Sequence, residues 1–221
     1  MNAFILAGGQ SSRMGRDKAL VEFQGRLLIE HALNRLVRLG FTPAILGNRP
    51  DLAKYAPVIS DNYPGSGPLA GIEAALTASS DDLNLFLPID LPLLPDEFLR
   101  WISARAHCTL ALATIPRHQG RSQPLCAVYH RALLPHARAA LAAGDGKVMR
   151  VVENAAKTLH LTAAHLRIDG FDVESVAACF DLSFRGSVER PSTPPVHRWF
   201  QNLNTPADLE NAALEEWPVI H

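Results

Sequence analysis

The sequence has little cysteine, no long apolar run and no segment typical of an export signal. Its three cysteines, Cys108, Cys126 and Cys179, are far apart, odd in number and without the spacing of metal ligands, so we expect free thiols in a reducing compartment. No apolar run approaches the roughly 18 residues of a membrane span, and the apolar start ends at Gly8, too early for a signal peptide. We therefore expect a cytoplasmic protein without a membrane partner.

The sequence also lacks an excess of charge of either sign. Its 21 Lys and Arg residues nearly balance its 22 Asp and Glu residues, for a formal net charge of −1. Such a chain has no overall basic field to attract nucleic acid, so we expect no nucleic-acid partner, and any phosphate binding must be local. A hydrophobic fraction of 48% and a charged fraction of 19% over 221 residues are typical of a globular protein and argue against disorder.

Several familiar catalytic motifs are missing as well. Gly15 is followed by Arg-Asp-Lys-Ala, which excludes a Walker A loop, and residues 8–13 do not supply the Gly-x-Gly-x-x-Gly of a dinucleotide fold. The absence of a Gly-x-Ser-x-Gly elbow argues against a Ser–His–Asp hydrolase. The nine histidines form no His-x-x-x-His pair, so we assign none of them to a metal.

The most informative stretch is the glycine-rich segment 6–18, Leu-Ala-Gly-Gly-Gln-Ser-Ser-Arg-Met-Gly-Arg-Asp-Lys. Residues 3–7, Ala-Phe-Ile-Leu-Ala, lead into it and are typical of a strand buried on both faces. Free N–H groups in such a turn form a concavity that suits anions, and Arg13, Arg16 and Lys18 add positive charge around it. The segment predicts a polyphosphate held at the end of a buried strand. An ordinary glycine turn with solvated charges is the alternative.

Apolar strands alternate with amphipathic helices along the first half of the chain. Strands are expected at residues 3–7, 43–47, 58–60 and 83–89, and helices at 27–39, from Pro68 onward and at 93–106. This alternation predicts an α/β fold, a Rossmann-like three-layer sandwich with a mostly parallel sheet and helices on both faces. Ligands gather at the carboxyl ends of such strands, which is where Gly8, Asn48, Asp61 and Asp90 fall.

The second half of the chain is less regular. We expect strands at 110–115 and 125–129, joined through the polar stretch 117–122, and helices at 131–143 and 148–156. Residues 157–197 show no motif, whereas Thr205-Pro206 with Asp208 is typical of a helix N-terminus. No linker or repeat stands out. The sequence therefore predicts a single domain over 1–221, with a nucleotide-binding half at about 1–107 and an acceptor-binding half at about 108–221.

Two aspartates are candidates for the site. Asp90 ends the most apolar strand, where a lone carboxylate is costly unless a cation or hydrogen bonds compensate it. A magnesium ion bridging a triphosphate would compensate it, because this hard ion prefers oxygen ligands. A cap of the following turn is the alternative for Asp90. Asp61 opens a loop rich in turn formers, so it could serve that turn alone.

Four stretches of the chain together resemble a known family. Leu-Ala-Gly-Gly-x-x-x-Arg-Met-Gly-x-x-Lys at 6–18 resembles the signature loop of the nucleotidyltransferase superfamily. Three others are similar to molybdenum cofactor guanylyltransferases: Pro-x-Asp-x-Pro around Asp90, Pro-Gly-x-Gly-Pro-Leu-Ala-Gly after Asp61, and Asn-x-Asn-Thr-Pro at 202–206. Two asparagines before a helix could also serve only as turn and cap residues. The resemblance covers residues 3–130 and 199–212 and is poor at 157–197.

The resemblance implies transfer of GMP from GTP to a molybdopterin-type cofactor with release of pyrophosphate, and a Mg²⁺ cofactor at Asp90. It implies GTP and the pterin as partners, with cofactor-inserting or chaperone proteins and molybdoenzymes as further candidates. Catalysis would fall to Arg13, Lys18 and Asp90, and acceptor binding to Asn202 and Asn204. We further expect Gln123 on the same acceptor side. The residues implied in nucleotide binding are Leu6, Ala7, Gly8, Gly9, Arg13, Lys18, Asn48, Asp61, Gly67, Pro68, Leu69, Gly71 and Asp90.

Two alternatives stay open at this point. The first is the same fold acting on CTP, or on a sugar phosphate or another phosphorylated acceptor, because base choice depends on the loop from Asn62 to Gly71. The second is a nucleotide-binding regulator that has lost catalysis. Against the second alternative, Arg13, Lys18 and Asp90 are all present in this chain.

Overall fold

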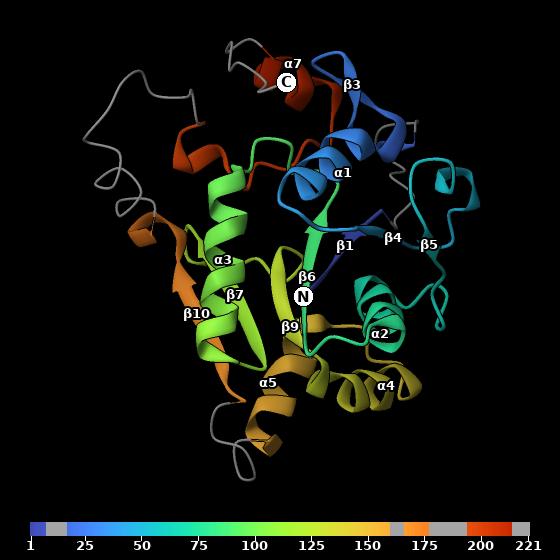
Figure 1. Cartoon of the computed structure of the whole chain (residues 1–221), viewed down its shortest axis with the longest axis vertical. Coiled ribbons are helices and arrows are strands. Elements are labelled where there is room, and N and C mark those ends of the chain that lie inside the picture. The colour runs from blue at the N-terminus through green and yellow to red at the C-terminus, as the bar shows by residue number, and fades with distance from the viewer. Residues whose placement is uncertain (8–16, 160–165, 177–193, 214–221) are drawn as a thin grey trace.

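The computed structural model describes residues 1–7, 17–159, 166–176 and 194–213 of the chain. Its main sheet has the strand order β10-β7-β9-β6-β1-β4-β5, and β8 pairs with β7 (Figure 1). The strands of this sheet are β1 (Asn2–Leu6), β4 (Ala44–Leu46), β5 (Val58–Ile59), β6 (Leu83–Pro88), β7 (Ala113–His118), β8 (Arg121–Ser122), β9 (Ala127–His130) and β10 (Ile168–Asp172). The sheet places β1 between β4 and β6, so that the four strands expected in the first half lie side by side.

Most strand pairs of this sheet are parallel. The strand β1 pairs in parallel with β4 and β6, β4 with β5, and β7 with β10. The strand β9 is antiparallel to both β6 and β7, and β8 is antiparallel to β7. The predicted fold class, a mostly parallel sheet in an α/β sandwich, is therefore confirmed.

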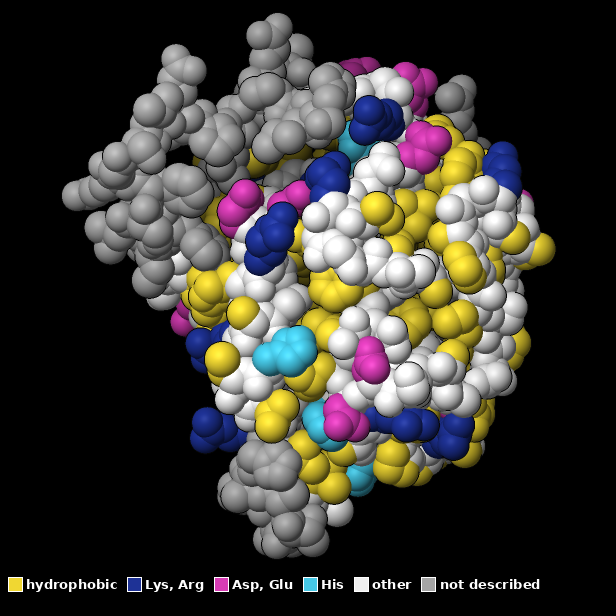
Figure 2. Space-filling model, in the orientation of Figure 1, with side chains coloured by type: hydrophobic (Ala, Val, Ile, Leu, Met, Phe, Trp, Pro, Cys, Tyr) yellow, Lys and Arg dark blue, Asp and Glu magenta, His cyan; other side chains and the backbone are white. Residues whose placement is uncertain are grey.

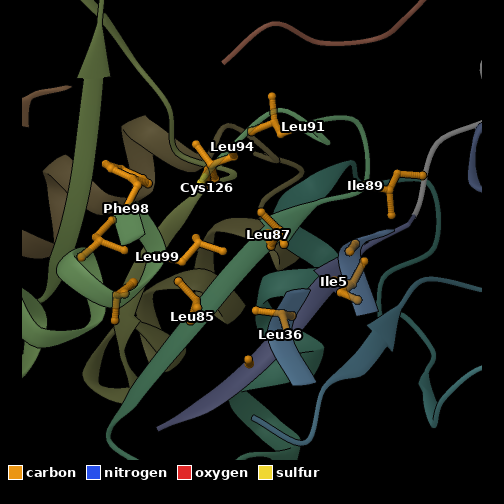
Figure 3. Close-up of a cluster of buried hydrophobic side chains, with 14 of the residues drawn as sticks. Ile5, Leu36, Leu85, Leu87, Ile89, Leu91, Leu94, Phe98, Leu99 and Cys126 are labelled. Atoms are coloured by element: carbon orange, nitrogen blue, oxygen red, sulfur yellow. The ribbon is translucent and has the colours of Figure 1, made fainter. Parts of the chain in front are cut away.

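The helices form layers on both faces of the sheet. They are α1 (Leu28–Arg38), α2 (Pro68–Ala78), α3 (Asp96–Thr109), α4 (Leu134–Ala142), α5 (Val148–Leu159) and α7 (Pro206–Ala213), with short 3-10 turns η1 (Lys18–Leu20), η2 (Pro50–Leu52), η3 (Arg131–Leu133) and η4 (Val196–Arg198). Successive side chains of a strand point to opposite faces. Ile5 of β1 accordingly packs in one buried cluster with α1 and α3, and Phe4 in another with α2, α4 and α5. Figure 3 shows Leu85 and Leu87 of β6 beside Leu36 of α1 and Leu99 of α3 in the first cluster.

The structure corrects several of the expected elements. The helix α3 continues to Thr109, and Leu110 caps it in the left-handed conformation (φ 48°), so β7 begins at Ala113 rather than at Leu110. The helix α5 runs to Leu159 instead of ending at residue 156. The strand β10 was not expected, because its sequence, Ile-Asp-Gly-Phe-Asp, carries residues that are depleted in strands. None of the helices in the described ranges is long and apolar enough to cross a membrane.

The C-terminal tail packs against the beginning of the chain. Leu203 and Ala212 share a buried cluster with Phe23, Leu28 and Leu93, so α7 lies over the hairpin of β2 (Glu22–Phe23) and β3 (Arg26–Leu27). The expected N-terminal cap of α7 is present. The Asp208 amide donates to Thr205 Oγ1 (3.1 Å), and the Asp208 carboxylate accepts from the Thr205 amide (2.8 Å). Figure 1 shows α7 beside β3 and α1.

Candidate functional site

A cleft of about 630 Å³ opens at the carboxyl ends of β1, β4 and β6. Ligands of open α/β sheets bind at this edge, and the volume is that of a typical small-molecule site. Its lining residues are Leu6, Lys18, Leu46, Gly47, Asp61, Gly65, Gly67, Pro68, Gly71, Pro88, Ile89, Asp90, Leu91, Gln123, Pro124, Leu125, Cys126 and Asn202. The face of the molecule in Figure 2 carries basic and acidic side chains interspersed, as the near-zero net charge predicts.

Lys18, Asp90 and Asn204 meet at this cleft. Lys18 begins η1, and its Nζ donates to Asp90 Oδ2 over 2.7 Å and to Asn204 Oδ1. The side chains of Lys18 and Asp90 are only 13% and 18% exposed. The tail is fastened here by its backbone as well, because the Leu203 amide donates to the Asp90 carbonyl (3.1 Å). Three residues predicted from separate motifs therefore form one hydrogen-bonded junction.

Asp90 has an oxygen to spare for a cation. Its Oδ1 is buried and has no hydrogen-bond partner within the described part of the chain. An unpartnered buried carboxylate oxygen is costly, and a bound cation would remove that cost. No group of three or more His, Cys, Asp or Glu that could hold a metal occurs among the described residues. This donor set fits Mg²⁺, which is commonly held by one or two carboxylates together with substrate phosphates and water.

Asp61 presents a second unpartnered oxygen to the cleft. Its Oδ1 is buried without a partner in the described ranges, and burial raises the pKa of this carboxyl. The Asp61 amide donates to Asn48 Oδ1 (3.2 Å), so Asn48 fixes the backbone of Asp61 rather than lining the cleft itself. Asn48 and Asp61 are thus joined by a hydrogen bond at the ends of β4 and β5.

Gly71 lets the backbone of α2 come close to the ends of two strands. A Cβ atom on Gly71 would lie 3.3 Å from Leu6 Cδ2 and 3.6 Å from Asp61 Oδ1. The backbone of α2 therefore sits directly on the ends of β1 and β4. Gly67 and Pro68 begin the same helix at the cleft, with Pro68 in its first turn.

Other predicted residues lie elsewhere. The side chains of Ala7 and Leu69 are buried (2% and 0% exposed) and do not line the cleft, so any role of theirs in nucleotide binding falls to the backbone. Gly8, Gly9 and Arg13 lie outside the described residues. Of the acceptor residues, Gln123 and Asn202 line the cleft, whereas Asn204 is bonded to Lys18.

Aromatic packing holds the tail in place. Trp199 and Phe200 lie with ring centroids 5.7 and 5.6 Å from Phe98 of α3, and Phe200 lies against His118 of β7 (5.5 Å). Because these rings are packed five and four residues before Asn204, they fix the backbone from which Asn202 and Asn204 extend. The structure thus explains how a segment almost 190 residues from Lys18 in sequence becomes part of its surroundings.

Two arginines near the site, Arg35 and Arg49, were not predicted from the sequence. Arg49 pairs with Asp17 through Nη1 and Oδ1 (3.0 Å), and so anchors the end of the glycine-rich segment. Arg35 of α1 is buried and donates to the carbonyls of Leu91 and Pro92, directly after Asp90. The signal for Arg35 was a charged residue on the apolar face of α1, since it follows Ala32 by three positions.

The wall of the cleft contains Cys126, which was predicted only as a free thiol. Cys126 is free and 1% exposed. Burial raises the pKa of its thiol to about 12, so the sulfur stays protonated near neutral pH. A protonated buried thiol is a poor nucleophile, so Cys126 forms part of the apolar wall.

Comparison with known proteins gives the same assignment as the motifs. The family model of the MobA-like NTP transferase domain matches residues 3–160. The chain is 38% identical over 153 residues to a molybdenum cofactor guanylyltransferase of Vibrio cholerae, covering 66% of this chain and 73% of that protein. It is 37% identical over 221 residues to a probable molybdenum cofactor guanylyltransferase of Deinococcus radiodurans, covering 95% and 92%.

The fold agrees with these matches. The crystal structure of molybdopterin-guanine dinucleotide biosynthesis protein A from Archaeoglobus fulgidus superimposes with a TM-score of 0.74 at 25% identity, covering 97% of each chain. The family match spans Leu6, Lys18, the loop that begins at Asp61, and Asp90, all of which contribute to the lining of the cleft. Sequence, fold and cleft therefore agree that the chain belongs to the MobA-like NTP transferase family.

Proposed function

We propose that this protein transfers GMP from GTP to a molybdopterin-type cofactor and releases pyrophosphate. The observation that carries the proposal is the junction of Lys18, Asp90 and Asn204, which joins the triphosphate side of the cleft to the tail. The relatives named molybdenum cofactor guanylyltransferase support the choice of donor and acceptor. The proposal keeps the division into a nucleotide-binding half at about 1–107 and an acceptor-binding half at about 108–221.

The triphosphate would lie against the glycine-rich segment and Lys18. Arg13 keeps its predicted role there, and Lys18 contributes an ammonium group that is already held in the cleft by two oxygen atoms. A donor that is fixed before the substrate arrives needs little reorganisation during the reaction, which makes its charge more effective. The base and ribose would lie along Gly65, Gly67 and Gly71, where Asp61 Oδ1 can accept from an N–H or O–H of the nucleotide.

The reaction needs no nucleophile from the protein. The terminal phosphate oxygen of the pterin attacks the α-phosphorus in line, a new P–O bond forms, and the bond from the α-phosphorus to the bridging α–β oxygen breaks. Pyrophosphate leaves on the opposite side. Transfer of this kind depends mainly on positioning and on charge stabilisation of the transferring group. The protonated Cys126 is consistent with this scheme, because it offers no competing nucleophile.

Magnesium would be held by Asp90 through its free Oδ1. When bound, the ion would neutralise negative charge on the phosphate oxygens of the nucleotide. Lys18, which bonds the other oxygen of the same carboxylate, would hold that side chain in position. Asn202 and Gln123 line the cleft and are proposed to contact the pterin, with Asn204 between the pterin and Lys18.

Beyond its substrates, the protein is proposed to hand its product to cofactor-inserting proteins or molybdoenzymes, since a finished cofactor must reach an enzyme. We also propose that it works in the cytoplasm. The thiols of Cys108 and Cys126 are free, and a reducing compartment keeps them so.

A nucleotide panel tests the proposal. Pyrophosphate release is measured with purified protein, Mg²⁺ and each of GTP, CTP, ATP and UTP, with and without purified molybdopterin cofactor. The proposal expects release with GTP that depends on the pterin. Release that prefers CTP would transfer the assignment to a cytidylyltransferase of the same fold. Nucleotide binding without release under any condition would favour the regulator.

A further inference from the structure

Arg35 is a buried charge whose partners lie beside the proposed metal site. It projects from α1 toward the segment that follows β6 and is only 8% exposed. Its Nη1 donates to the Leu91 carbonyl (2.9 Å), its Nη2 to the Pro92 carbonyl (2.5 Å) and its Nε to Asp96 Oδ1 (3.1 Å). The three nitrogens of one guanidinium thus donate hydrogen bonds to both ends of the turn between Asp90 and α3.

Burying a guanidinium group costs desolvation free energy, which its hydrogen bonds must offset. Burial of the guanidinium lowers the pKa of Arg35, although it still stays charged at neutral pH. A buried cation is tolerated when every donor finds an acceptor, and here two acceptors are backbone carbonyls of the turn. An aliphatic side chain at this position would fill space at lower cost but would leave both carbonyls without these donors.

The side chains of the turn, residues 91–95, are buried, but its backbone has few other hydrogen bonds. It contains Pro92 and Pro95, and proline has no N–H to donate. The backbone bonds that it does make are Leu94 N–H to the Leu91 carbonyl (3.3 Å) and the tail's Leu203 N–H to the Asp90 carbonyl (3.1 Å). Arg35, on α1, donates two further hydrogen bonds to this turn, and their acceptors are the carbonyls of the two residues that follow Asp90.

We infer that Arg35 is a positioning residue for Asp90. By fixing the carbonyls of Leu91 and Pro92, Arg35 fixes the backbone next to Asp90. This sets the orientation of the Asp90 side chain and the position of its free Oδ1. The inference rests on the proposed function, because it gives Asp90 a cation to bind. Groups that orient a metal ligand from behind typically change metal affinity or activity by about 10- to 100-fold when they are removed.

Arg38 provides a matched control on the same helix. Its Nε donates to Asp96 Oδ2 (3.1 Å), so Arg35 and Arg38 share one carboxylate. Arg38 is solvent-exposed, whereas Arg35 also reaches the turn. Removing Arg38 therefore deletes a cation beside Asp96 and leaves the carbonyl contacts of Arg35 in place.

The test compares R35Q and R38Q with the wild type. Mn²⁺ binding in the presence of GTP is measured by electron paramagnetic resonance, alongside kcat and the KM for GTP, well below each variant's melting temperature. We expect R35Q to weaken Mn²⁺ binding and to lower kcat by about 10-fold or more, with the KM for GTP nearly unchanged. R38Q should stay within about twofold of the wild type in all three. If R35Q were only partly unfolded, the number of Mn²⁺ sites per protein and the kcat would fall. The Mn²⁺ affinity of the remaining folded molecules would stay that of the wild type.

A folded R35Q that binds Mn²⁺ as tightly as the wild type overturns the inference, as does a wild type that binds no Mn²⁺ with GTP. If R35Q fails to fold, R35K decides, because lysine keeps the charge but lacks the planar fork that lets Arg35 bond Asp96 and both carbonyls together. We expect R35K to bind Mn²⁺ several-fold more weakly, and equal affinity refutes the role. The proposed function fails separately, when the wild type binds Mn²⁺ and GTP but releases no pyrophosphate with the pterin.

Discussion

Gly146 offers a test of how the loop at residues 65–67, part of the proposed nucleotide site, is supported. A Cβ atom added there would lie 2.3 Å from the carbonyl oxygen of Ser66 and 3.3 Å from its carbonyl carbon. Carbon and carbonyl oxygen normally approach no closer than about 3.3 Å, so G146A must push the two backbones apart by about 1 Å. Ser66 lies between Gly65 and Gly67, which both line the cleft. The displacement therefore reaches the proposed nucleotide site.

Two effects follow from a displacement of that size. Overpacking against a backbone costs about 1–3 kcal/mol of folding free energy. A shift of about 1 Å in a positioning element can cost up to about 100-fold in activity. Since Gly65 and Gly67 are proposed to contact the nucleotide, we expect most of the loss as a higher KM for GTP. Steady-state kinetics over a range of GTP concentrations and thermal unfolding measure the two effects.

Gly144 is the matched control, two residues away. A Cβ there meets nothing within 4 Å, but the residue has φ +78°. We expect G144A to lose about 1–2 kcal/mol of stability from backbone strain alone and to keep the KM for GTP of the wild type. If G146A leaves both stability and the KM unchanged, or if G144A raises the KM equally, the reasoning is refuted.

Three further predictions follow from the site and its surroundings. K18M should lower pterin-dependent turnover by about 10²–10³-fold, because it removes a preorganised cation beside Asp90, and an unchanged kcat would contradict the assignment of Lys18. C126A should keep kcat within a few-fold of the wild type, since the thiol is protonated, whereas complete loss of turnover in a folded C126A would point to covalent catalysis. Burial alone would raise the pKa of Glu73, but hydrogen bonds from Arg138, Asn62 and Thr77 lower it below 4.5. The stability that Glu73 contributes is therefore full above about pH 4.5 and is lost as the pH falls through the lowered pKa. In urea unfolding, the difference in unfolding free energy between the wild type and E73Q should shrink toward acid pH. A constant difference from about pH 7 to pH 4 would contradict this.

Local patterns predicted what is encoded locally. The strands at 3–7 and 83–89 are recovered within one residue at each end, because a continuous apolar run is a strong signal for a strand buried on both faces. Asp90 and Lys18 were predicted at the same edge of the sheet because carboxyl ends of parallel strands share an edge. Their direct hydrogen bond of 2.7 Å depends on how far the Lys18 side chain extends, which the spacing of residues in the sequence does not predict.

What the sequence did not predict depends on contacts between distant segments. Arg35 lies on the apolar face of α1, but the sequence does not identify its partners Leu91 and Pro92, which lie 56 and 57 residues away. Gly71 was predicted as a nucleotide-binding residue, and the structure shows that Leu6 and Asp61 lie where its Cβ atom would be. Asn204 was predicted to bind the acceptor, and its hydrogen bond with Lys18, which accompanies the docking of Trp199 and Phe200 on α3, was not predicted.

The proposed function requires that the α-phosphate of GTP is transferred, with its guanosine, to the pterin phosphate. To follow this transfer, [α-³²P]GTP and [γ-³²P]GTP are incubated separately with the protein, Mg²⁺ and purified molybdopterin cofactor. We expect the α label in a pterin product and the γ label in pyrophosphate. Recovery of the α label only as GTP or free GMP, with the pterin unlabelled, would contradict it.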